Sequence, residues 1–473
     1  MEADGAVAPV LDAGVTPDAG LPTVQRSHER EMRGVWIATV FNIVFPSRAG
    51  LSVDAQRAEL GRLLDVAAEA HLNTVFFQVR AEGDAFYRSQ LEPWSRFLTG
   101  RQGQDPGWDP LAEAIEGAHD RGLELHAWLN PYRAAASMGI DHPATHVASR
   151  FPAHAHAYDT GVWMDPGAAE VRAHTVAVIR DLVGRYDLDG VHFDDYFYPY
   201  PDGSPFPDDA TWAAYQAAGG ALGRDDWRRD NVNRLVQEVS DAITAIDPDV
   251  RFGISPFGIY RPGIPPGIVG LDQYGSIFAD PVHWLEAGYV DYLAPQLYWN
   301  ATRPQQDYET LLRWWTSLTA GGRQIYVGNY LSQLGSAAAW DVAEFERELG
   351  ISRALRPQGS AGNIYFHLGP LAENRAGIAD VFRERFYPTP ALTPPLAGRG
   401  AEVVAPPRVS AAGNRVQLAD AGRVRGHVVY DEAGAVFRVV RRPEITLPAG
   451  TWAITAVGRQ GAESAAVEVT VRP

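Results

Sequence analysis

Residues 188–196 read Leu-Asp-Gly-Val-His-Phe-Asp-Asp-Tyr, a short apolar run that ends in two aspartates. Side chains alternate along a β-strand, so Val191 and Phe193 share one face while His192 and Asp194 share the other. The apolar pair needs a packed layer such as a covering helix. The polar pair then points to the opposite side, into the interior of a sheet that is closed on itself. The surrounding sequence decides whether such a sheet is present.

Seven further short runs, rich in β-branched and aromatic residues, precede and follow this stretch, and amphipathic segments separate them. Leu60, Leu63, Leu64 and Ala67 show the i, i+3, i+4, i+7 spacing of a helix face. Repeated β-then-α units predict a parallel sheet closed into a (β/α)8 TIM barrel. An open doubly wound sheet is the alternative, but no glycine-rich phosphate-binding turn follows the first strand. The predicted strands are 34–40, 74–79, 124–129, 190–194, 251–255, 292–297, 324–328 and 363–366.

The chain is expected to contain more than the barrel, which we assign to residues 31–387. Residues 1–30, rich in Ala, Asp, Gly and Pro, predict a disordered tether. Residues 388–407 are proline-rich and predict an exposed linker. Residues 408–473 contain short alternating runs separated by turn residues, which predicts a small β-sandwich of immunoglobulin or fibronectin type. Its predicted strands are 415–418, 426–430, 436–440, 452–457 and 465–471.

Composition limits the classes of function. The 473 residues carry a formal net charge of −17 and no cysteine. The acidity argues against nucleic acid or an anionic membrane as the main partner, since both require clustered basic residues. The lack of cysteine excludes a disulfide scaffold and a thiolate nucleophile. No apolar run reaches the length of a transmembrane helix. The acidic leader is typical of a mature lipoprotein, so we expect export, with a lipid anchor upstream of Met1; a cytosolic protein is the alternative.

The chemistry of a barrel lies at the carboxyl ends of its strands. Asp194 and Asp195 follow the fourth strand and Asp84 follows the second, and these three are the predicted catalytic residues. Carboxylates among aromatic side chains are typical of sugar hydrolysis, which needs an acid for the leaving oxygen and a second group at the anomeric centre. The residues predicted to bind the sugar are Arg80, His126, Trp128, Asn130, Arg133, His192, Tyr196, Ser255, Gln296, Tyr298 and Trp299.

Two other interpretations of the predicted site residues are possible. Asp194 or Asp195 could cap the following loop or pair with an arginine, which is the more common role of a lone aspartate. His126, His192 and Asp194 could together bind a metal ion. Barrel metallohydrolases usually carry His-x-His on the first strand, whereas residues 36–38 read Trp-Ile-Ala. We therefore predict no metal and no cofactor.

A series of motifs resembles one bacterial family, glycosyl-hydrolase-like family ten. The resemblance covers about residues 33–387, and its motifs occur in order along the chain. It implies a cell-envelope location and a polysaccharide substrate, because the family includes a divisome-localised enzyme that cleaves peptide-free peptidoglycan. The first substrate to test is therefore a β-1,4-linked GlcNAc/MurNAc glycan. The motifs are Arg33-Gly-Val-Trp36, Phe77-Gln-Val-Arg80, Gly83-Asp-Ala-Phe-Tyr87, Glu92-Pro-Trp-Ser95, His126-Ala-Trp-Leu-Asn-Pro-Tyr-Arg133, Asp189-Gly-Val-His-Phe-Asp-Asp-Tyr-Phe-Tyr-Pro199, Trp227-Arg-Arg-Asp-Asn-Val-Asn233, Gly253-Ile-Ser-Pro-Phe-Gly258 and Asp291-Tyr-Leu-Ala-Pro-Gln-Leu-Tyr-Trp299.

A weaker resemblance concerns the mechanism. Asp189-Gly-x-His-x-Asp-x-Tyr196 is similar to the strand-four motif of family-eighteen chitinases, and Gln296-x-Tyr298 is similar to their strand-six Met-x-Tyr. Those enzymes use the substrate's own N-acetyl group as the nucleophile. The resemblance implies that Asp194 orients the acetamide and that Tyr298 is its hydrogen-bond partner.

The sequence departs from the chitinase pattern at the acid. The position of the chitinase glutamate is Tyr196, so the proton has to come from Asp195 or Asp84. A β-glucanase arrangement fails, because the seventh strand ends in Gly328-Asn329-Tyr330 and supplies no glutamate. We therefore predict a glycoside hydrolase of an N-acetylated envelope glycan. A non-catalytic glycan-binding protein and a hydrolase of another polysaccharide, such as an exopolysaccharide, are the alternatives.

Overall fold

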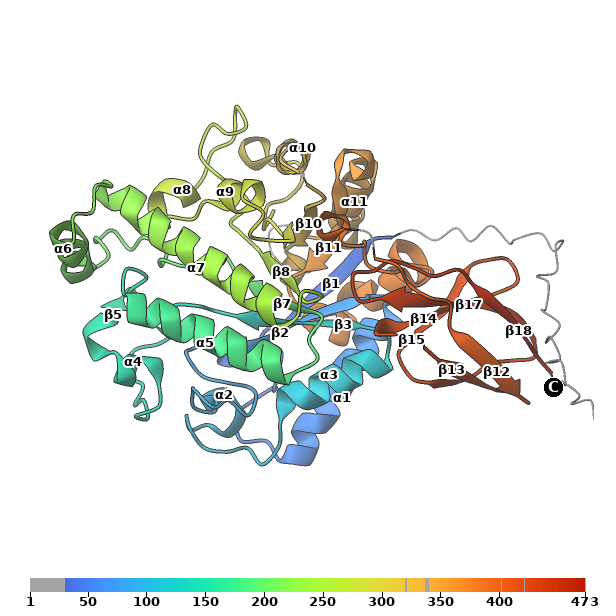
Figure 1. Ribbon diagram of the computed structural model, residues 1–473. Coiled ribbons are helices and arrows are strands. Elements are labelled where there is room, and N and C mark those ends of the chain that lie inside the picture. Colours follow the sequence, from blue (N-terminus) through green and yellow to red (C-terminus); the bar gives the residue numbers. More distant parts are fainter. Residues whose placement is uncertain (1–29, 320, 337–339, 401, 421, 473) are drawn as a thin grey trace, which may run out of the picture.

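The computed structural model describes residues 30–472 apart from 320, 337–339, 401 and 421. It shows a closed parallel barrel followed by a smaller all-β module that lies against one end of the barrel (Figure 1). The (β/α)8 barrel and the C-terminal sandwich predicted from the sequence are both confirmed. The predicted tether falls, except for Arg30, outside the described residues.

All eight predicted strands form the barrel, in the order β1-β2-β3-β7-β8-β9-β10-β11 with β11 closing on β1. Several strands end before their predicted bounds, β9 by the most. It ends at Leu293 because Pro295 has no N–H for the ladder, and beyond it Gln296 makes only isolated bridges. The bounds are β1 (Met32–Ile37), β2 (Thr74–Arg80), β3 (Glu124–Leu129), β7 (Gly190–Phe193), β8 (Arg251–Ile254), β9 (Tyr292–Leu293), β10 (Gln324–Asn329) and β11 (Ser360–Tyr365).

Helices surround the barrel and bury their apolar faces on its outer surface. On the first long helix, Leu60, Leu63, Leu64 and Ala67 are buried as the spacing predicts. The outward side chains of the strands, Val191 and Phe193 among them, pack in this same layer. The helices are α1 (Val53–Glu69), α2 (Arg96–Thr99), α3 (Pro110–Asp120), α4 (Val147–Arg150), α5 (Ala169–Arg185), α6 (Asp209–Ala217), α7 (Arg224–Ile246), α8 (Gln273–Ser276), α9 (Pro281–Glu286), α10 (Tyr308–Ser317), α11 (Val342–Ala354), α12 (Gly369–Ala372) and α13 (Ile378–Val381).

A second apolar cluster fills the inside of the barrel with large aromatic side chains. Trp36, Phe76, Trp128, Tyr292 and Tyr326 are its main members, and all are at least 95% buried. The barrel is therefore a packed core rather than a channel, and ligands can reach only its two ends. We call the carboxyl ends of the strands the mouth and the amino ends the base.

One connection carries an additional small sheet that the sequence did not predict. Between β3 and α5, the antiparallel strands β4 (Arg133–Ala135), β5 (Ala155–Tyr158) and β6 (Gly161–Met164) pair in the order β4-β6-β5. This sheet holds Arg133 and Trp163 beside the loop that follows β7, where both contact Tyr196.

The C-terminal module consists of two antiparallel sheets packed around a small core that includes Val416, Val429 and Ile454. All five predicted strands are present. Two strands were not predicted, β12 and β16, which flank β13 in the smaller sheet. The bounds are β12 (Arg408–Ala412), β13 (Arg415–Ala419), β14 (Val424–Tyr430), β15 (Val436–Val440), β16 (Glu444–Thr446), β17 (Gly450–Gly458) and β18 (Val467–Val471).

The segment between barrel and module is only in part the exposed linker that its prolines indicate. Residues 391–394 and Leu396 are buried. Leu392 accepts a hydrogen bond from the backbone N–H of Glu31, and Thr393 donates one to the Glu124 carboxylate at the base. The expected exposure therefore fails for residues 391–394 and 396, whereas other residues of the segment are exposed, Val403 at 93%. The domain boundaries stay predictions.

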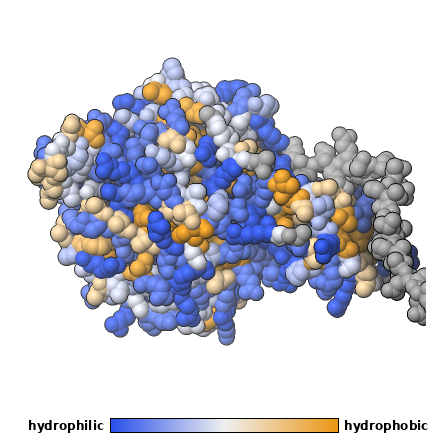
Figure 2. Space-filling view, in the orientation of Figure 1, coloured by the Kyte–Doolittle hydropathy of each residue, from blue (hydrophilic) through white to orange (hydrophobic). Residues whose placement is uncertain are grey.

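The face shown in Figure 2 is mainly hydrophilic, with scattered hydrophobic areas. Within the described residues, no helix has the length and hydrophobicity needed to span a bilayer.

Candidate active site

A pocket opens at the mouth of the barrel, at the ends of several strands. It contains both aspartates of the fourth barrel strand and a majority of apolar and aromatic side chains. Its lining residues are Trp36, Ala38, Val40, Phe41, Ile43, Gln78, Trp128, Asp194, Asp195, Tyr196, Ser255, Gln296, Tyr298 and Phe366. Seven of the residues predicted from the sequence therefore line one pocket.

Asp194 is held by two donors from the neighbouring strand. The Asn130 side-chain amide and the Trp128 indole N–H, the latter at 3.3 Å, both donate to Asp194 Oδ2. The other oxygen, Oδ1, is buried and has no hydrogen-bond partner among the described residues. Burial, followed by the neighbouring Asp195, raises the pKa of Asp194 to about 7. The group can therefore carry a proton at neutral pH.

Asp195 has a different environment. The Tyr200 hydroxyl donates to Asp195 Oδ2. Burial raises the pKa of Asp195, whereas hydrogen bonds from Tyr200 and Gln296 act in the opposite direction. The charge of Asp195 is one cause of the raised pKa of Asp194, and its own donors favour its ionised form, so Asp195 is the better candidate for the charged member of the pair.

A chain of side-chain amides and one arginine orients Asn130 towards Asp194. Gln78 Nε2 donates to Asn130 Oδ1 at 2.7 Å, and Arg133 Nη2 donates to the same oxygen at 3.1 Å. With its oxygen fixed in this way, Asn130 must direct its N–H2 at the carboxylate. Arg133 also donates to the Tyr196 hydroxyl at 2.7 Å. Asn130 and Arg133 thus support the pocket without lining it.

The opposite wall is formed by the strands that follow. Gln296 Nε2 donates to the Ser255 carbonyl at 3.0 Å, which joins β8 to the segment after β9. Tyr298 stacks on Tyr330 with ring centroids 4.5 Å apart, and both rings contact Phe366. Aromatic faces of this kind can pack against the C–H face of a sugar ring.

The structure does not bring every predicted residue to the pocket. Asp84 is buried, accepts hydrogen bonds from the Glu82 N–H and from Gln102, and does not line the pocket, although burial raises its pKa to about 6. Arg80 forms a two-bond pair with Glu92 at 2.6 and 2.8 Å. Trp299 packs on Phe257 outside the pocket.

His126 and His192 lie below the pocket floor, inside the barrel, and both contact the Tyr292 hydroxyl. Their rings therefore belong to the packed interior rather than to the wall that a substrate would touch. In the described part of the chain, no group of three or more His, Asp or Glu side chains is arranged to hold a metal ion.

Sequence reasoning missed three kinds of pocket residue. Tyr200 reaches Asp195 from the loop after β7, and the run Tyr-Phe-Tyr-Pro-Tyr over 196–200 was the available signal. Phe41 and Ile43 present exposed apolar side chains at the rim after β1. Phe366 follows directly after β11 and also lines the pocket, and no polar group in its side chain indicated a role.

Comparison with known proteins places this site in a family context. The family model described as Glycosyl hydrolase-like 10 matches residues 31–344. The chain is 40% identical over 384 residues to the glycosyl hydrolase YngK of Bacillus subtilis strain 168, covering 78% of this chain and 74% of the relative. It is 34% identical over 386 residues to the glycosyl hydrolase DigH of Escherichia coli K12, covering 74% and 87%.

One solved structure supports the fold. The PgaB (BpsB) glycoside hydrolase domain from Bordetella bronchiseptica matches with a TM-score of 0.50 at 14% identity, over 75% of this chain and 98% of that domain. At this identity, the likeness concerns the barrel architecture alone.

Proposed function

The chain belongs to the glycosyl hydrolase-like 10 family, and from this premise we propose that it hydrolyses a glycan, with Asp194 and Asp195 as the catalytic pair. The observation that carries the proposal is the pair itself: two adjacent buried carboxyl groups at the barrel mouth, in a pocket with aromatic walls. Glycoside hydrolysis requires two carboxyl groups of unequal acidity, or one acid and a substrate acetamide.

The different surroundings of Asp194 and Asp195 give the two carboxyl groups different roles. Asp194, with a pKa of about 7 and an oxygen that lacks a partner, is the group that keeps a proton and can donate it to the leaving oxygen. Asp195 accepts a hydrogen bond from the Tyr200 hydroxyl. It is the ionised group that stabilises positive charge at the anomeric carbon or orients the acetamide. This division reverses the assignment implied by the chitinase resemblance, in which Asp194 orients the acetamide.

Retention of anomeric configuration is part of the proposal. An inverting enzyme needs a second carboxylate that activates a water on the far side of the sugar, ~6.5–9.5 Å from the acid. Apart from Asp194 and Asp195, no carboxylate lines the pocket among the described residues. Attack by the substrate's own acetamide needs no further protein group.

The substrate that we propose is an N-acetylated envelope glycan, first of all peptide-free peptidoglycan with β-1,4-linked GlcNAc and MurNAc. The family resemblance of the sequence supports this choice, and the apolar pocket walls suit the N-acetyl methyl group. Export to the envelope, with a lipid anchor, is part of the same proposal, because the polymer lies outside the cytoplasm.

One experiment tests the activity and the substrate together. The protein is incubated with denuded peptidoglycan, chitin and an acidic exopolysaccharide, and new reducing ends are identified by mass spectrometry. We expect products from the first glycan, and proton NMR should show the β-anomer first. Products from the exopolysaccharide alone would replace the substrate. Binding without any new reducing end would indicate a glycan-binding protein, and an α-anomer first would exclude the acetamide route.

A further inference from the structure

A line of buried polar rings runs through the barrel below the candidate active site. Trp36 of β1 donates its indole N–H to His192 Nε2 of β7 at 3.2 Å. His192 Nδ1 lies 3.0 Å from the Tyr292 hydroxyl of β9, and His126 Nδ1 of β3 lies 2.9 Å from the same hydroxyl. Each of these rings comes from a different strand, and the Phe76 ring packs against both imidazoles at 4.8 Å.

The barrel is built to admit these rings. A Cβ at Gly190 of β7 would lie 2.5 Å from His126 Nδ1, and a Cβ at Gly253 of β8 would lie 2.1 Å from the Tyr292 ring. Any other residue at either position would displace the ring from the line. Two glycines on adjacent strands therefore reserve the space for His126 and Tyr292.

The direction of every hydrogen bond in the line follows from the first donor. An indole N–H can only donate, so His192 Nε2 accepts and carries no proton. Burial and the nearby His126 lower the pKa of His192, so the ring is neutral and its proton is on Nδ1. That N–H donates to the Tyr292 oxygen, and the Tyr292 hydroxyl in turn donates to His126 Nδ1. His126 then carries its proton on Nε2.

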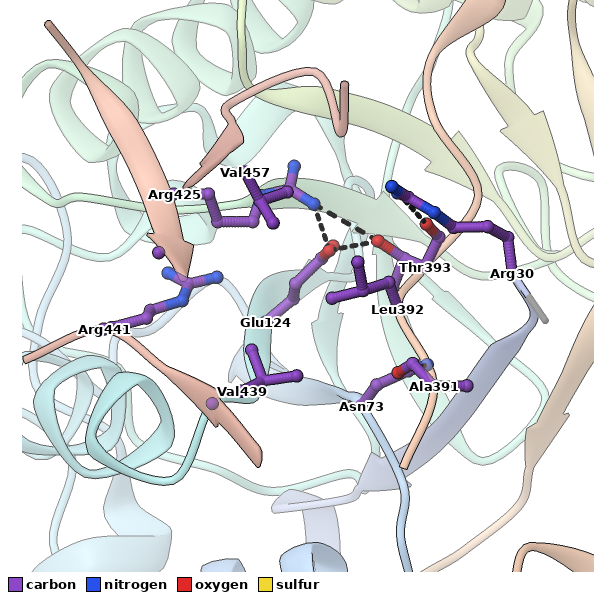
Figure 3. A pocket seen from close by; sticks show the side chains of 12 residues that line it. Arg30, Asn73, Glu124, Ala391, Leu392, Thr393, Arg425, Val439, Arg441 and Val457 are labelled. Atoms are coloured by element: carbon purple, nitrogen blue, oxygen red, sulfur yellow. Dashed lines mark hydrogen bonds and ion pairs between the residues drawn. The ribbon is translucent and has the colours of Figure 1, made fainter. Parts of the chain in front are cut away.

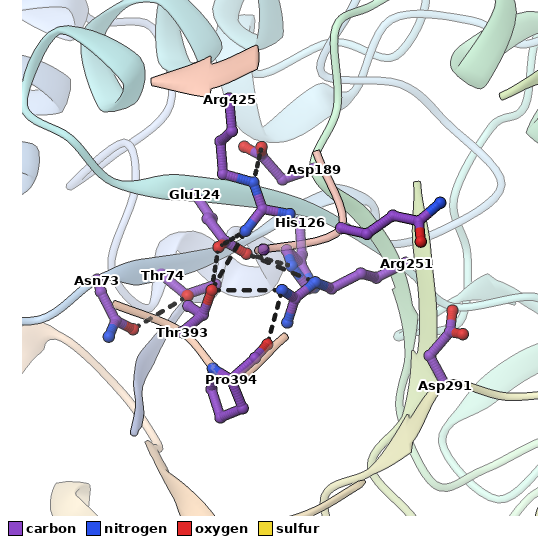
Figure 4. Close-up of polar contacts among 12 residues, drawn as sticks. Asn73, Thr74, Glu124, His126, Asp189, Arg251, Asp291, Thr393, Pro394 and Arg425 are labelled. Atoms are coloured by element: carbon purple, nitrogen blue, oxygen red, sulfur yellow. Dashed lines mark hydrogen bonds and ion pairs between the residues drawn. The ribbon is translucent and has the colours of Figure 1, made fainter. Parts of the chain in front are cut away.

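The lower end of the line meets a carboxylate at the base. His126 Nε2 lies 3.6 Å from Glu124 Oε2. Arg425, from strand β14 of the C-terminal module, and Thr393, from the connecting segment, both donate to the other oxygen, Glu124 Oε1 (Figure 3). Arg251 approaches Glu124 Oε2 at 3.9 Å, so the carboxylate lies between two arginines (Figure 4). The C-terminal module thus holds one end of a line whose other end is the pocket floor.

The upper end reaches groups that line the pocket. Trp36 is itself a lining residue, and Ser255 Oγ, another lining group, lies 3.1 Å from His192 Nε2. A change of the His192 tautomer would turn its Nε2 into a donor. It would then repel the Trp36 N–H and leave the Ser255 hydroxyl with a donor in place of an acceptor.

We propose that Arg425 of the C-terminal module is a positioning residue for the active site: by holding Glu124 beside His126 Nε2, it stabilises the tautomers of His126 and His192 that match the Trp36 donor, and thereby the positions of Trp36 and Ser255. This rests on the proposed function of the pocket. A neutral or freely rotating Glu124 side chain would no longer present a fixed anionic oxygen to His126 Nε2–H. The module then contributes to catalysis although none of its described residues lines the pocket.

The test compares Arg425 of β14 with Arg423, which directly precedes that strand. Arg425→Gln removes the arginine that donates to Glu124. The Arg425 side chain is only 7% exposed. Arg423→Gln removes an ion pair with barrel residue Asp247 from an arginine that is 58% exposed, and it touches no member of the line. Imidazole ¹⁵N spectra of histidine-labelled protein report the tautomers directly, with His126→Gln and His192→Gln used for assignment.

We expect the ring nitrogens of His126 and His192 to change in Arg425→Gln and to stay unchanged in Arg423→Gln. On the glycan identified above, kcat should fall ~10- to 100-fold in Arg425→Gln with a smaller change in KM, since misplacement by about 1 Å can cost 10²-fold. Wild-type nitrogen signals in folded Arg425→Gln would overturn the proposal. So would altered signals with unchanged kcat and KM.

A second variant covers a failure to fold. Glu124→Gln/Arg425→Met removes one charge of each sign, so that Arg425 is not left buried without its carboxylate, and Arg251 keeps the Pro394 carbonyl and the Tyr326 hydroxyl. The same nitrogen changes are expected there, and unchanged signals would overturn the proposal. The spectra are recorded without glycan, so an enzyme inactive on every glycan would remove the proposed function while the tautomers still decide the role of Arg425.

Discussion

The base and the mouth of the barrel both bury carboxyl groups, but in opposite electrostatic surroundings. At the base, burial alone would raise the pKa of Glu124, yet Arg251 and Arg425 lower it. Asp189 behaves in the same way beside Arg441. At the mouth, burial raises the pKa of both Asp194 and Asp195, and there an arginine only weakly opposes it.

The difference shows how one chain assigns carboxyl groups to stability or to chemistry. A buried carboxylate with a fixed arginine partner is held ionised and joins two parts of the structure. A buried carboxyl group beside a second one keeps a proton that it can transfer. The base therefore connects the barrel to its module, whereas the mouth is the reactive end.

The largest effect is expected when the contacts between the C-terminal module and the base are removed. Deleting residues 389–473 removes Arg425 and Thr393 from Glu124, and Arg399 from Asp291. Breaking one buried ion pair costs about 3–5 kcal/mol, so losing several should destabilise the barrel by more than that. Soluble yield, near-ultraviolet circular dichroism and urea denaturation measure the effect. A truncated barrel with the wild-type denaturation midpoint would mean that the base does not depend on the module.

A single substitution at the base should have a smaller effect of the same kind. Glu124→Gln leaves Arg251 and Arg425 without their shared carboxylate and should lower the free energy of unfolding by about 3–5 kcal/mol at pH 7. The pKa of Glu124 is lowered in the folded state, so its contribution is present above the unfolded value of 4.5 and is lost at lower pH. The difference from wild type, measured by urea denaturation, should therefore shrink below about pH 4. A pH-independent difference would contradict an electrostatic origin.

The matching substitutions at the mouth should affect rate rather than stability. Asp194→Asn and Asp195→Asn should each reduce kcat/KM at least ~100-fold, the lower end for general acid–base groups.

The stability of the Asp194 variant should depend on pH. The pKa of Asp194 rises from 3.8 to about 7 on folding, so the free energy of unfolding of the wild type falls as pH increases through that range. Asp194→Asn avoids this loss and should equal wild type below pH 4 and be more stable above pH 7. Near-wild-type rates in both variants would place the catalytic pair elsewhere.

The barrel could be predicted from sequence because its signals are local. Alternation along 190–194 and helix spacing at Leu60–Ala67 each depend on a few neighbouring residues, and the mouth position of Asp194 follows from strand parity. The contacts at the base could not be predicted. Glu124 and Arg425 are separated by 301 positions, and the sequence around each residue does not indicate that the two form a pair. The prolines of 388–407 were interpreted through composition, which does not indicate what a segment covers.

Loops at the mouth account for the remaining differences. Asp84 follows β2 as expected, but Gly83 has a positive φ of 62°, and the turn at this position directs the carboxyl group to Gln102. Tyr200 lies five residues beyond Asp195 in a segment without regular structure, so no periodicity indicated that its hydroxyl would return to that carboxylate. The sequence therefore placed residues just beyond the strand ends, such as Asp194 and Gln296, but neither the loop residue Tyr200 nor the depth of His126 and His192 inside the barrel.

The smallest expected effect concerns Tyr200, whose hydroxyl makes Asp195 differ from Asp194. Tyr200→Phe removes the donor that opposes the rise in the Asp195 pKa, so that pKa should increase further. If Asp195 acts in its ionised form, the acid limb of the kcat/KM profile should move to higher pH. At the optimum, kcat/KM should fall about tenfold, corresponding to the lower end for a hydrogen bond to a charged group, ~1.5 kcal/mol.

Tyr158→Phe is the matched control. It also removes a tyrosine hydrogen bond, but one to the Ser204 carbonyl away from the pocket, and it should keep the wild-type profile. An unchanged acid limb in Tyr200→Phe would show that Asp195 is not the ionised partner. The two carboxyl groups of the mouth would then have to exchange roles, and Asp194, held by Asn130, would be the ionised one.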